Sequence, residues 1–211
     1  MNEHNGAQQG IPVHRQNHVA KMLEFYRRVS NWNSKRYERE HVQELAYKLL
    51  TEEFTEYQEA LHPVHKLDGL CDTAFVALGV LWKLDVEGDF DLAHGIHSAF
   101  TLADNFHSMK GSAYVRPLVI GMIEHILRHD SYAAQFCLDI TVLCAYLACE
   151  ELPIDADTFF EACHIVADSN DTKAVKRTAS HVKANIDKGT SFVPPEQRLA
   201  ALLNIDLPKE K

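Results

Sequence analysis

Apolar residues recur every three or four positions along most of this chain, and the alternation of apolar and polar residues typical of strands is nearly absent. Such a repeat places the apolar side chains on one face of a helix. We therefore expect an all-α fold, a bundle of antiparallel helices. The pattern predicts helices over residues 18–29, 37–61, 65–84, 89–108, 114–129, 132–150, 155–168 and 172–187, and a short one that begins near Pro195.

Interruptions of the pattern set the expected boundaries. Residues 30–34, with the sequence SNWNS, indicate a loop, and Pro63 ends the preceding helix because proline cannot continue the hydrogen-bond ladder. Residues 1–15 are expected to be disordered. No segment has the composition of a flexible linker, so residues 1–211 are expected to form one domain. The residues suited to cap helices are Asp155 or Asp157 for the helix at 155–168, and Ser169 or Asp171 for the helix at 172–187.

The composition is that of an ordinary globular protein, with 211 residues, 46% of them hydrophobic and 24% charged. The formal net charge of −9 argues against nucleic-acid binding driven by phosphate neutralisation. An acidic protein can still bind a triphosphate when divalent cations bridge the two negative partners.

The cysteines and the hydropathy pattern favour a cytoplasmic protein. No two cysteines form a CxxC pair, and all lie inside apolar helical patterns, which indicates reduced, buried thiols. The N-terminus lacks a hydrophobic signal segment, and no uninterrupted apolar run reaches the ~18 residues of a spanning helix. We therefore expect no membrane association. The cysteines are Cys71, Cys137, Cys144, Cys149 and Cys163.

Two groups of acidic residues lie on neighbouring predicted helices. Glu52, Glu53 and Glu56 share one helix face, because their spacings are i, i+3 and i, i+4. Asp68 and Asp72 are one turn apart on the next helix. The short break between the helices makes them antiparallel neighbours, so the two acidic faces can meet. Carboxylates this dense repel one another unless a cation lies between them, and Mg²⁺ prefers such oxygen ligands.

A run of glutamates on a helix is often only a solvated face, and this is the alternative to a metal site. Asp72 favours the metal site, because the apolar sequence TAFVALGVLW follows it at once and is typical of a buried helix. An aspartate at the edge of a buried helix needs a partner, and a metal ion is one of the few that serve.

Two segments resemble a known superfamily. EEFTEYQEAL, the proline-containing break and DGLCDTAFVALG look like the all-α nucleoside triphosphate pyrophosphohydrolases, the MazG-like and phosphoribosyl-ATP pyrophosphohydrolase-like proteins. Downstream, LPIDADTFFEACHIVADSNDTKAV is similar to the family's ending, where a helix leads into an Asn-x-Ser-Lys element. The matches cover about residues 44–84 and 152–190. The resemblance implies a Mg²⁺-dependent hydrolase, with Mn²⁺ able to substitute, that converts a nucleoside triphosphate and water into a nucleoside monophosphate and pyrophosphate.

The resemblance also implies a set of metal ligands. Glu53, Glu56 and Asp72 fall on the ligand positions of the family. Many members carry a further glutamate three residues before the aspartate, where this chain has Gly69. Asp68 lies one position earlier and would take the place of that glutamate, which leaves the number of metal ions open.

The resemblance implies three further roles. Glu52 would accept a proton from the attacking water, and Asn170 and Lys173 would contact the substrate, with Lys173 on a phosphate. The family removes aberrant nucleotides or adjusts deoxynucleotide pools, so a deoxynucleoside triphosphate is the favoured substrate. Its members are usually dimers or tetramers, and we expect a homodimer.

Residues 85–152 separate the two matching segments. They form either a helical insertion or a degenerate second repeat, in which residues 112–131 replace the acidic helix and keep only Glu124. A repeat would relate the two halves by approximate two-fold symmetry.

Other functions have weaker support. His129 and Asp130 form the His-Asp pair of HD-type phosphohydrolases, which are also helical and metal-dependent. A non-catalytic relative that only binds a nucleotide is favoured by Gly69 alone. His125 and His129 lie one turn apart, but no further zinc ligands accompany them. No GxxxxGK[ST] or GxGxxG sequence occurs, which excludes P-loop and Rossmann sites.

Overall fold

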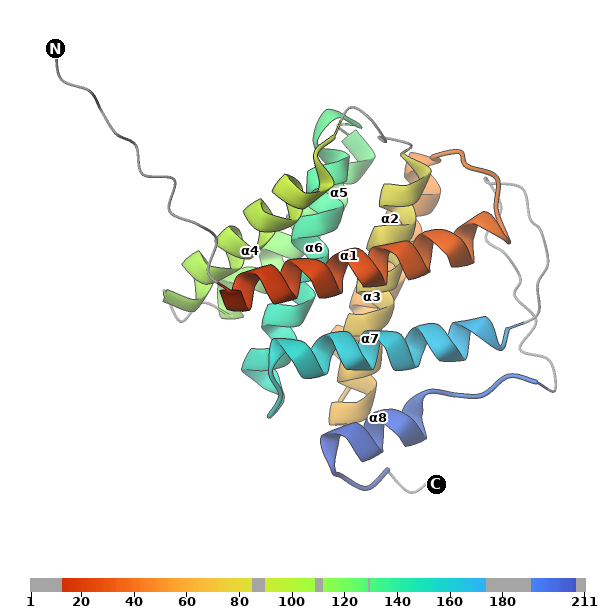
Figure 1. Ribbon diagram of the computed structural model, residues 1–211, viewed down its shortest axis with the longest axis vertical. Helices are drawn as coiled ribbons and strands as arrows, with labels where there is room; N and C mark the ends of the chain where they lie inside the picture. The colour runs from red at the N-terminus through yellow and green to blue at the C-terminus, as the bar shows by residue number, and fades with distance from the viewer. Residues whose placement is uncertain (1–12, 85–89, 109–111, 129, 174–190, 208–211) are drawn as a thin grey trace, which may run out of the picture.

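The computed structural model describes residues 13–84, 90–108, 112–128, 130–173 and 191–207. Within these ranges the protein is all-α, as the periodicity predicts, and its helices pack around one apolar core (Figure 1). The helices are α1 (Val13–Ser34), α2 (Gln43–Glu59), α3 (Pro63–Lys83), α4 (Leu92–Ser108), α5 (Ser112–Arg128), α6 (Asp130–Glu151), α7 (Ala156–Asp171) and α8 (Glu196–Leu203).

Two helices, α3 and α6, lie at the centre of the fold. α3 packs against α1, α2, α6, α7 and α8, whereas α6 packs against α3, α4, α5 and α7. In Figure 1, α1 and α7 run side by side across α2 and α3. A helix with neighbours on so many sides must be apolar nearly all round, which explains the sequence TAFVALGVLW in α3.

The break between α2 and α3 lies before Pro63, as predicted, but Pro63 itself begins α3, two residues before the predicted start. α2 ends at Glu59, and the backbone of Ala60 is extended. His62 caps α3, because its side chain accepts a hydrogen bond from the backbone N–H of Val64 at 3.2 Å. Pro63 occupies the first turn, where its missing N–H costs nothing. α3 therefore folds back along α2.

A close approach of α2 and α3 occurs at Gly69. A Cβ atom added to Gly69 would lie 2.9 Å from the N, Cα and Cβ atoms of Tyr57. The fully buried Tyr57 is also held through its hydroxyl, which donates to Glu151 Oε1 at 2.6 Å and accepts from Arg116 Nε at 3.1 Å. Tyr57 is thus constrained both at its backbone and at its hydroxyl, so the spacing of the two helices is fixed at this point.

We expect Gly69→Ala to lower the free energy of unfolding by about 1–3 kcal/mol, because the new methyl group would overlap backbone atoms. Gly121→Ala in α5 is the control, since its Cβ would meet no heavy atom within 4 Å. That variant should gain ~0.5–1 kcal/mol from helix propensity. Chemical denaturation measures the free energy of unfolding of both variants. If the two substitutions changed it by the same amount in the same direction, the close packing at Gly69 would be contradicted.

The loop predicted at residues 30–34 is wrong, because α1 continues to Ser34. The buried ring of Trp32 lies edge-on to Phe75, with 5.2 Å between the ring centroids. Its Nε1 donates to the backbone carbonyl of Asn170 at 3.0 Å. Burial of this side chain stabilises an additional helical turn despite the modest helix propensities of serine and asparagine.

The ends of α1 and α2 also differ from expectation. α1 begins at Val13, so residues 13–15 are helical rather than disordered, and residues 1–12 lie outside the described ranges. α2 begins at Gln43 and not near residue 37. Arg39 gives a reason, because its Nε donates to the backbone carbonyl of Trp82 at 2.9 Å and holds the preceding segment against the end of α3.

Asp155, one of the two residues predicted to cap α7, is confirmed as its cap. Asp155 Oδ1 accepts hydrogen bonds from the backbone N–H and the hydroxyl of Thr158, at 2.8 and 2.7 Å. α7 continues to Asp171, three residues beyond its predicted end. Almost all of the helix predicted at 172–187 lies outside the described residues.

The stretch Tyr132–Glu151 in α6 is long and apolar enough to cross a membrane by length and composition, although the sequence pattern did not indicate such a stretch. However, 78% of it is buried inside the fold, as in the core helix of many proteins. One such helix is weak evidence, so the expectation of no membrane association stays a prediction.

The contacts of residues 85–152 bear on their origin. α2 packs against α5, and α3 packs against α6. A duplicated chain would pair corresponding helices in this way. Both the second repeat and the helical insertion stay predictions.

α6 also buries a carboxylate, that of Asp139, which is 7% exposed. Its Oδ1 accepts a hydrogen bond from Gln135 Nε2 at 2.8 Å, and the same amide donates to the carbonyl of Gly95 at 3.0 Å. Burial raises the pKa of Asp139 to about 6, and the hydrogen bond from Gln135 opposes this rise. Ionised Asp139 therefore destabilises the folded state.

The raised pKa of Asp139 makes stability depend on pH. The folded state binds the proton more tightly than the unfolded chain, so the free energy of unfolding should decrease as pH rises from 3.8 to about 6 and stay lower above that range. Asp139→Asn keeps the hydrogen bond from Gln135 and removes the charge. We expect it to be more stable than the wild type by roughly 1–3 kcal/mol at pH 7 and equal to it at pH 4.

Thermal unfolding of Asp139→Asn from pH 4 to pH 8 measures this difference. Asp206→Asn, at an exposed position, is the control and should follow the wild type. A constant offset between Asp139→Asn and the wild type across the whole range would show that ionisation of Asp139 is not the cause.

Candidate metal centre

The structure brings together carboxylates from the two predicted acidic faces. Glu53 in α2 and Asp68 in α3 both have a pKa raised well above the usual range. Burial is the largest cause for each, and the charge of Asp72 is the second. The charge of Glu53 also raises the pKa of Asp68. These three carboxylates therefore lie within range of direct charge interaction, as their positions in the sequence predict.

Glu52 and Glu56 lie on the same helix as Glu53, and Glu56 is the one nearer the surface. Their charges raise the pKa of Glu53 less than Asp72 does, with Glu56 contributing more than Glu52. Glu56 is exposed, and Glu52 is half-buried. A carboxylate at such a rim can reach a water molecule or a second cation without the desolvation that Glu53 undergoes.

Two oxygen atoms in this region are buried without a hydrogen-bond partner in the described part of the chain. One is Oδ1 of Asp68, and the other is Oε2 of Glu196 in α8. The charge of Glu196 contributes to the raised pKa of Asp68, next after that of Asp72. Buried carboxylate oxygens are costly without a partner, and each is suited to accept a cation.

Lys173 supplies positive charge to the same region. Its attraction partly opposes the rise in the pKa of both Glu53 and Asp68. The Lys173 ammonium lies 5.8 Å from the centroid of the Phe192 ring, and its backbone carbonyl accepts from Arg36 at 3.4 Å. Lys173 is thereby held beside the carboxylates, as the predicted phosphate contact requires.

The segment after residue 190 packs against the end of α7 beside Lys173. The hydroxyl of Thr172 donates to the carbonyl of Ser169 at 2.7 Å and accepts from the backbone N–H of Val193 at 2.9 Å. Ser191 Oγ donates to the carbonyl of Thr172 at 3.3 Å. These bonds fix the position from which α8 begins.

Asn170 occupies a different environment from Lys173. It is 5% exposed, and its carbonyl accepts from Trp32 Nε1 at 3.0 Å and from the backbone N–H of Lys173 at 3.2 Å. Asn170 therefore connects α1 to the turn that carries Lys173. Its direct contact with a substrate stays a prediction.

The donor set fits Mg²⁺ as a group of carboxylates. Among the described residues, no three His, Cys, Asp or Glu side chains are already gathered closely enough to hold a metal ion. Mg²⁺ does not require such a cage, because it keeps several waters and commonly takes one or two carboxylates together with substrate phosphates. Hard oxygen donors are those that Mg²⁺ and Mn²⁺ prefer. Glu53, Asp68 and Asp72 supply such donors, and a pair of them would hold the ion together with waters and substrate phosphates.

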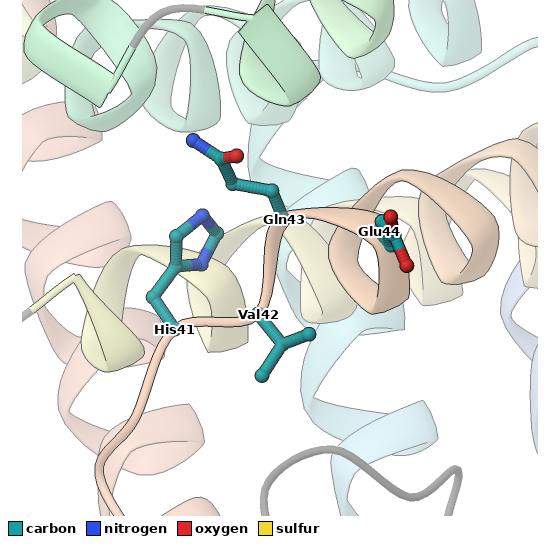
Figure 2. Close-up of a pocket in the computed structure, with 4 residues that line it drawn as sticks. All are labelled: His41, Val42, Gln43 and Glu44. Atoms are coloured by element: carbon teal, nitrogen blue, oxygen red, sulfur yellow. The ribbon is translucent and has the colours of Figure 1, made fainter.

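A separate shallow depression lies at the start of α2 (Figure 2). It is lined by His41, Val42, Gln43 and Glu44, with the side chains of His41 and Gln43 on the same side of the segment. Glu44 precedes Glu53 by nine residues, which is roughly 13 Å along the helix. This depression is therefore distinct from the carboxylates, and Glu44 is its one acidic side chain.

The remaining predicted groups are the cysteines and the His-Asp pair. All five cysteines are free thiols, four of them buried and Cys149 half-buried, as expected. Burial is the largest cause of the raised pKa of Cys71, and the neighbouring Cys163 thiol adds to it. His129 and the side chain of Asp130, on which the HD-type alternative depends, lie outside the described residues.

Comparison with known proteins leaves the family unassigned, because no family model, curated protein or solved structure matches this chain.

The carboxylates should destabilise the protein when no cation is bound. We expect Asp68→Asn to raise Tm by about 2–4 °C in EDTA, because it removes one of several buried like charges. The same substitution should reduce or abolish the rise in Tm that Mg²⁺ gives the wild type. Scanning calorimetry with and without Mg²⁺ measures both effects, and Asp206→Asn should change neither. A lower Tm in EDTA for Asp68→Asn would contradict the charge repulsion.

Proposed function

We propose that this protein is a Mg²⁺-dependent nucleoside triphosphate pyrophosphohydrolase that acts on deoxynucleoside triphosphates. One observation carries the proposal: Glu53, Asp68 and Asp72 lie in mutual charge range beside Lys173, and Asp68 keeps a buried oxygen without a partner. Carboxylates that destabilise a fold in this way are common at functional sites. The resemblance of the acidic segments to the all-α pyrophosphohydrolases gives the reaction class.

Each residue has a part in the proposed reaction. Glu53, Asp68 and Asp72 are the carboxylates that would hold the cation, and the chemistry it would supply is charge neutralisation of the triphosphate and a lowered pKa of water. Glu52, which is half-buried beside Glu53, takes a proton from water as the water oxygen forms a bond to the α-phosphorus. The bond from the α-phosphorus to the oxygen that bridges to the β-phosphorus breaks. Lys173 balances the charge of the departing pyrophosphate.

The proposal predicts pyrophosphate release that depends on both Mg²⁺ and Glu53. We expect the wild type to release pyrophosphate from at least one member of a panel of ribo- and deoxynucleoside triphosphates, and EDTA to abolish the release. Glu53→Ala should lower kcat/KM by at least about 100-fold, because it removes a ligand of the cation. A coupled assay for pyrophosphate, with product analysis by ion-exchange chromatography, measures this.

Glu59→Ala is the matched control, because Glu59 lies on the same helix and is exposed. It should keep the wild-type rate. Equal activity of Glu53→Ala and the wild type would refute the proposed site. Release of orthophosphate in place of pyrophosphate would support an HD-type phosphohydrolase, and nucleotide binding without turnover would support a non-catalytic relative.

A further inference from the structure

Two side chains at the end of α1 contact the end of α7. The two helices pack side by side and end on the same side of the fold (Figure 1). Trp32 Nε1 donates a hydrogen bond to the backbone carbonyl of Asn170 at 3.0 Å. Arg36, four residues later, donates through Nη2 to the backbone carbonyl of Lys173 at 3.4 Å. Both bonds therefore reach the short segment that carries the predicted phosphate contact.

Arg36 is itself held against the core. Its backbone N–H donates to the carbonyl of Asn33 at 2.9 Å, and its Nη1 donates to the carbonyl of Trp32 at 3.3 Å. The central carbon of the guanidinium lies 4.3 Å from the centroid of the Trp32 ring. That ring lies edge-on to Phe75 of α3. A chain of contacts thus runs from α3 through Trp32 and Arg36 to the backbone of Lys173.

An arginine at the end of a helix has an ordinary explanation, because its charge interacts favourably with the last carbonyls and the helix dipole. An exposed side chain is sufficient for that interaction, and the neighbouring Lys35 is exposed. Arg36 is only 3% exposed, and its Nε is buried without a hydrogen-bond partner among the described residues. Burial lowers the pKa of Arg36, and the charge of Asp171 opposes this change. The helix dipole alone does not explain the burial of a charged group at this cost.

The shape of the guanidinium explains why the residue is an arginine. Its planar fork presents several N–H groups at fixed angles, so one side chain can stack on a ring and donate to two carbonyls at once. In Arg36 these carbonyls belong to Trp32, near the end of α1, and to Lys173, just after α7. A lysine ammonium lacks this fork and cannot reproduce the stacked, two-carbonyl arrangement.

We propose that Arg36 is a positioning residue for phosphate binding, which holds the backbone of Lys173 where its ammonium can reach the phosphates of the substrate. Arg36 acts through Lys173 and does not touch the phosphates itself. This inference rests on the phosphate contact of Lys173 in the proposed function. It adds a residue at the end of α1 to a site whose other members lie in α2, in α3 and at the end of α7.

Calorimetric titration of the full-length protein with inorganic pyrophosphate and Mg²⁺ tests this role without an assay of activity. We expect Arg36→Met to weaken pyrophosphate binding by about tenfold, because the backbone of Lys173 loses a hydrogen bond to a charged group. In a Lys173→Met background the same substitution should have little further effect, because the two residues act through one group. Lys35→Met is the matched control, since it removes an equal charge from the adjacent exposed position, and it should leave the affinity unchanged.

Arg36→Lys keeps the charge but not the fork, so it should bind pyrophosphate nearly as weakly as Arg36→Met. Thermal unfolding verifies that each variant is folded, and Arg36→Lys, the smaller change, carries the test if Arg36→Met is unfolded. Wild-type affinity in the Arg36 variants would overturn the positioning role. So would additive effects of the Arg36 and Lys173 substitutions, which would show that Arg36 acts independently of Lys173.

The same titration separates this inference from the proposed hydrolysis. Weakened, non-additive binding in the variants, with no pyrophosphate release from any nucleotide by the wild type, would support the positioning role and refute the hydrolysis. A wild type that releases pyrophosphate from a nucleotide, but whose affinity for pyrophosphate does not depend on Lys173, would overturn the positioning role and leave the hydrolysis intact.

Discussion

The contact between α2 and α3 at Gly69 is the constraint on which the candidate site depends. Because no side chain separates the helices there, the backbone of Tyr57 lies directly against α3. The same tyrosine is held from its other end by Glu151 and Arg116. One turn before Tyr57, Glu53 is thereby brought into charge range of Asp72. Close backbone packing, rather than attraction between the polar groups, holds the carboxylates together.

This arrangement has a cost that the core must offset. Burial and like charge raise the pKa of Glu53 and of Asp68, so each ionised carboxylate destabilises the fold when no cation is present. The extensive apolar surface of α3 and α6 supplies the compensating free energy. A chain selected for stability alone would place apolar or uncharged residues at these positions. Carboxylates with perturbed pKa values are common at functional sites, and this supports the proposed site.

Local signals in the sequence were sufficient for much of the fold and for part of the site. Pro63 and the helical period predicted the α2–α3 hairpin, and with it the meeting of Glu53 with Asp72. The continuation of α1 through Trp32 could not be predicted, because it depends on a partner 138 residues away in α7. The effect of Glu196 on Asp68 was missed for the same reason: its first-turn position is ordinary, and only the packing of α8 on α3 brings its charge near Asp68.

The balance of charge connects the distant segments to the proposed chemistry. Glu53, Asp68 and Asp72 contribute three carboxylates, and among the described residues the charge of Lys173 opposes the raised pKa of Glu53 and Asp68. A triphosphate would add further negative charge beside these carboxylates. Divalent cations would reverse the sign of the interaction and join protein and substrate. In the proposed reaction, affinity for nucleotide would therefore depend on the metal, and apo stability and cation binding would place opposing demands on the same three side chains.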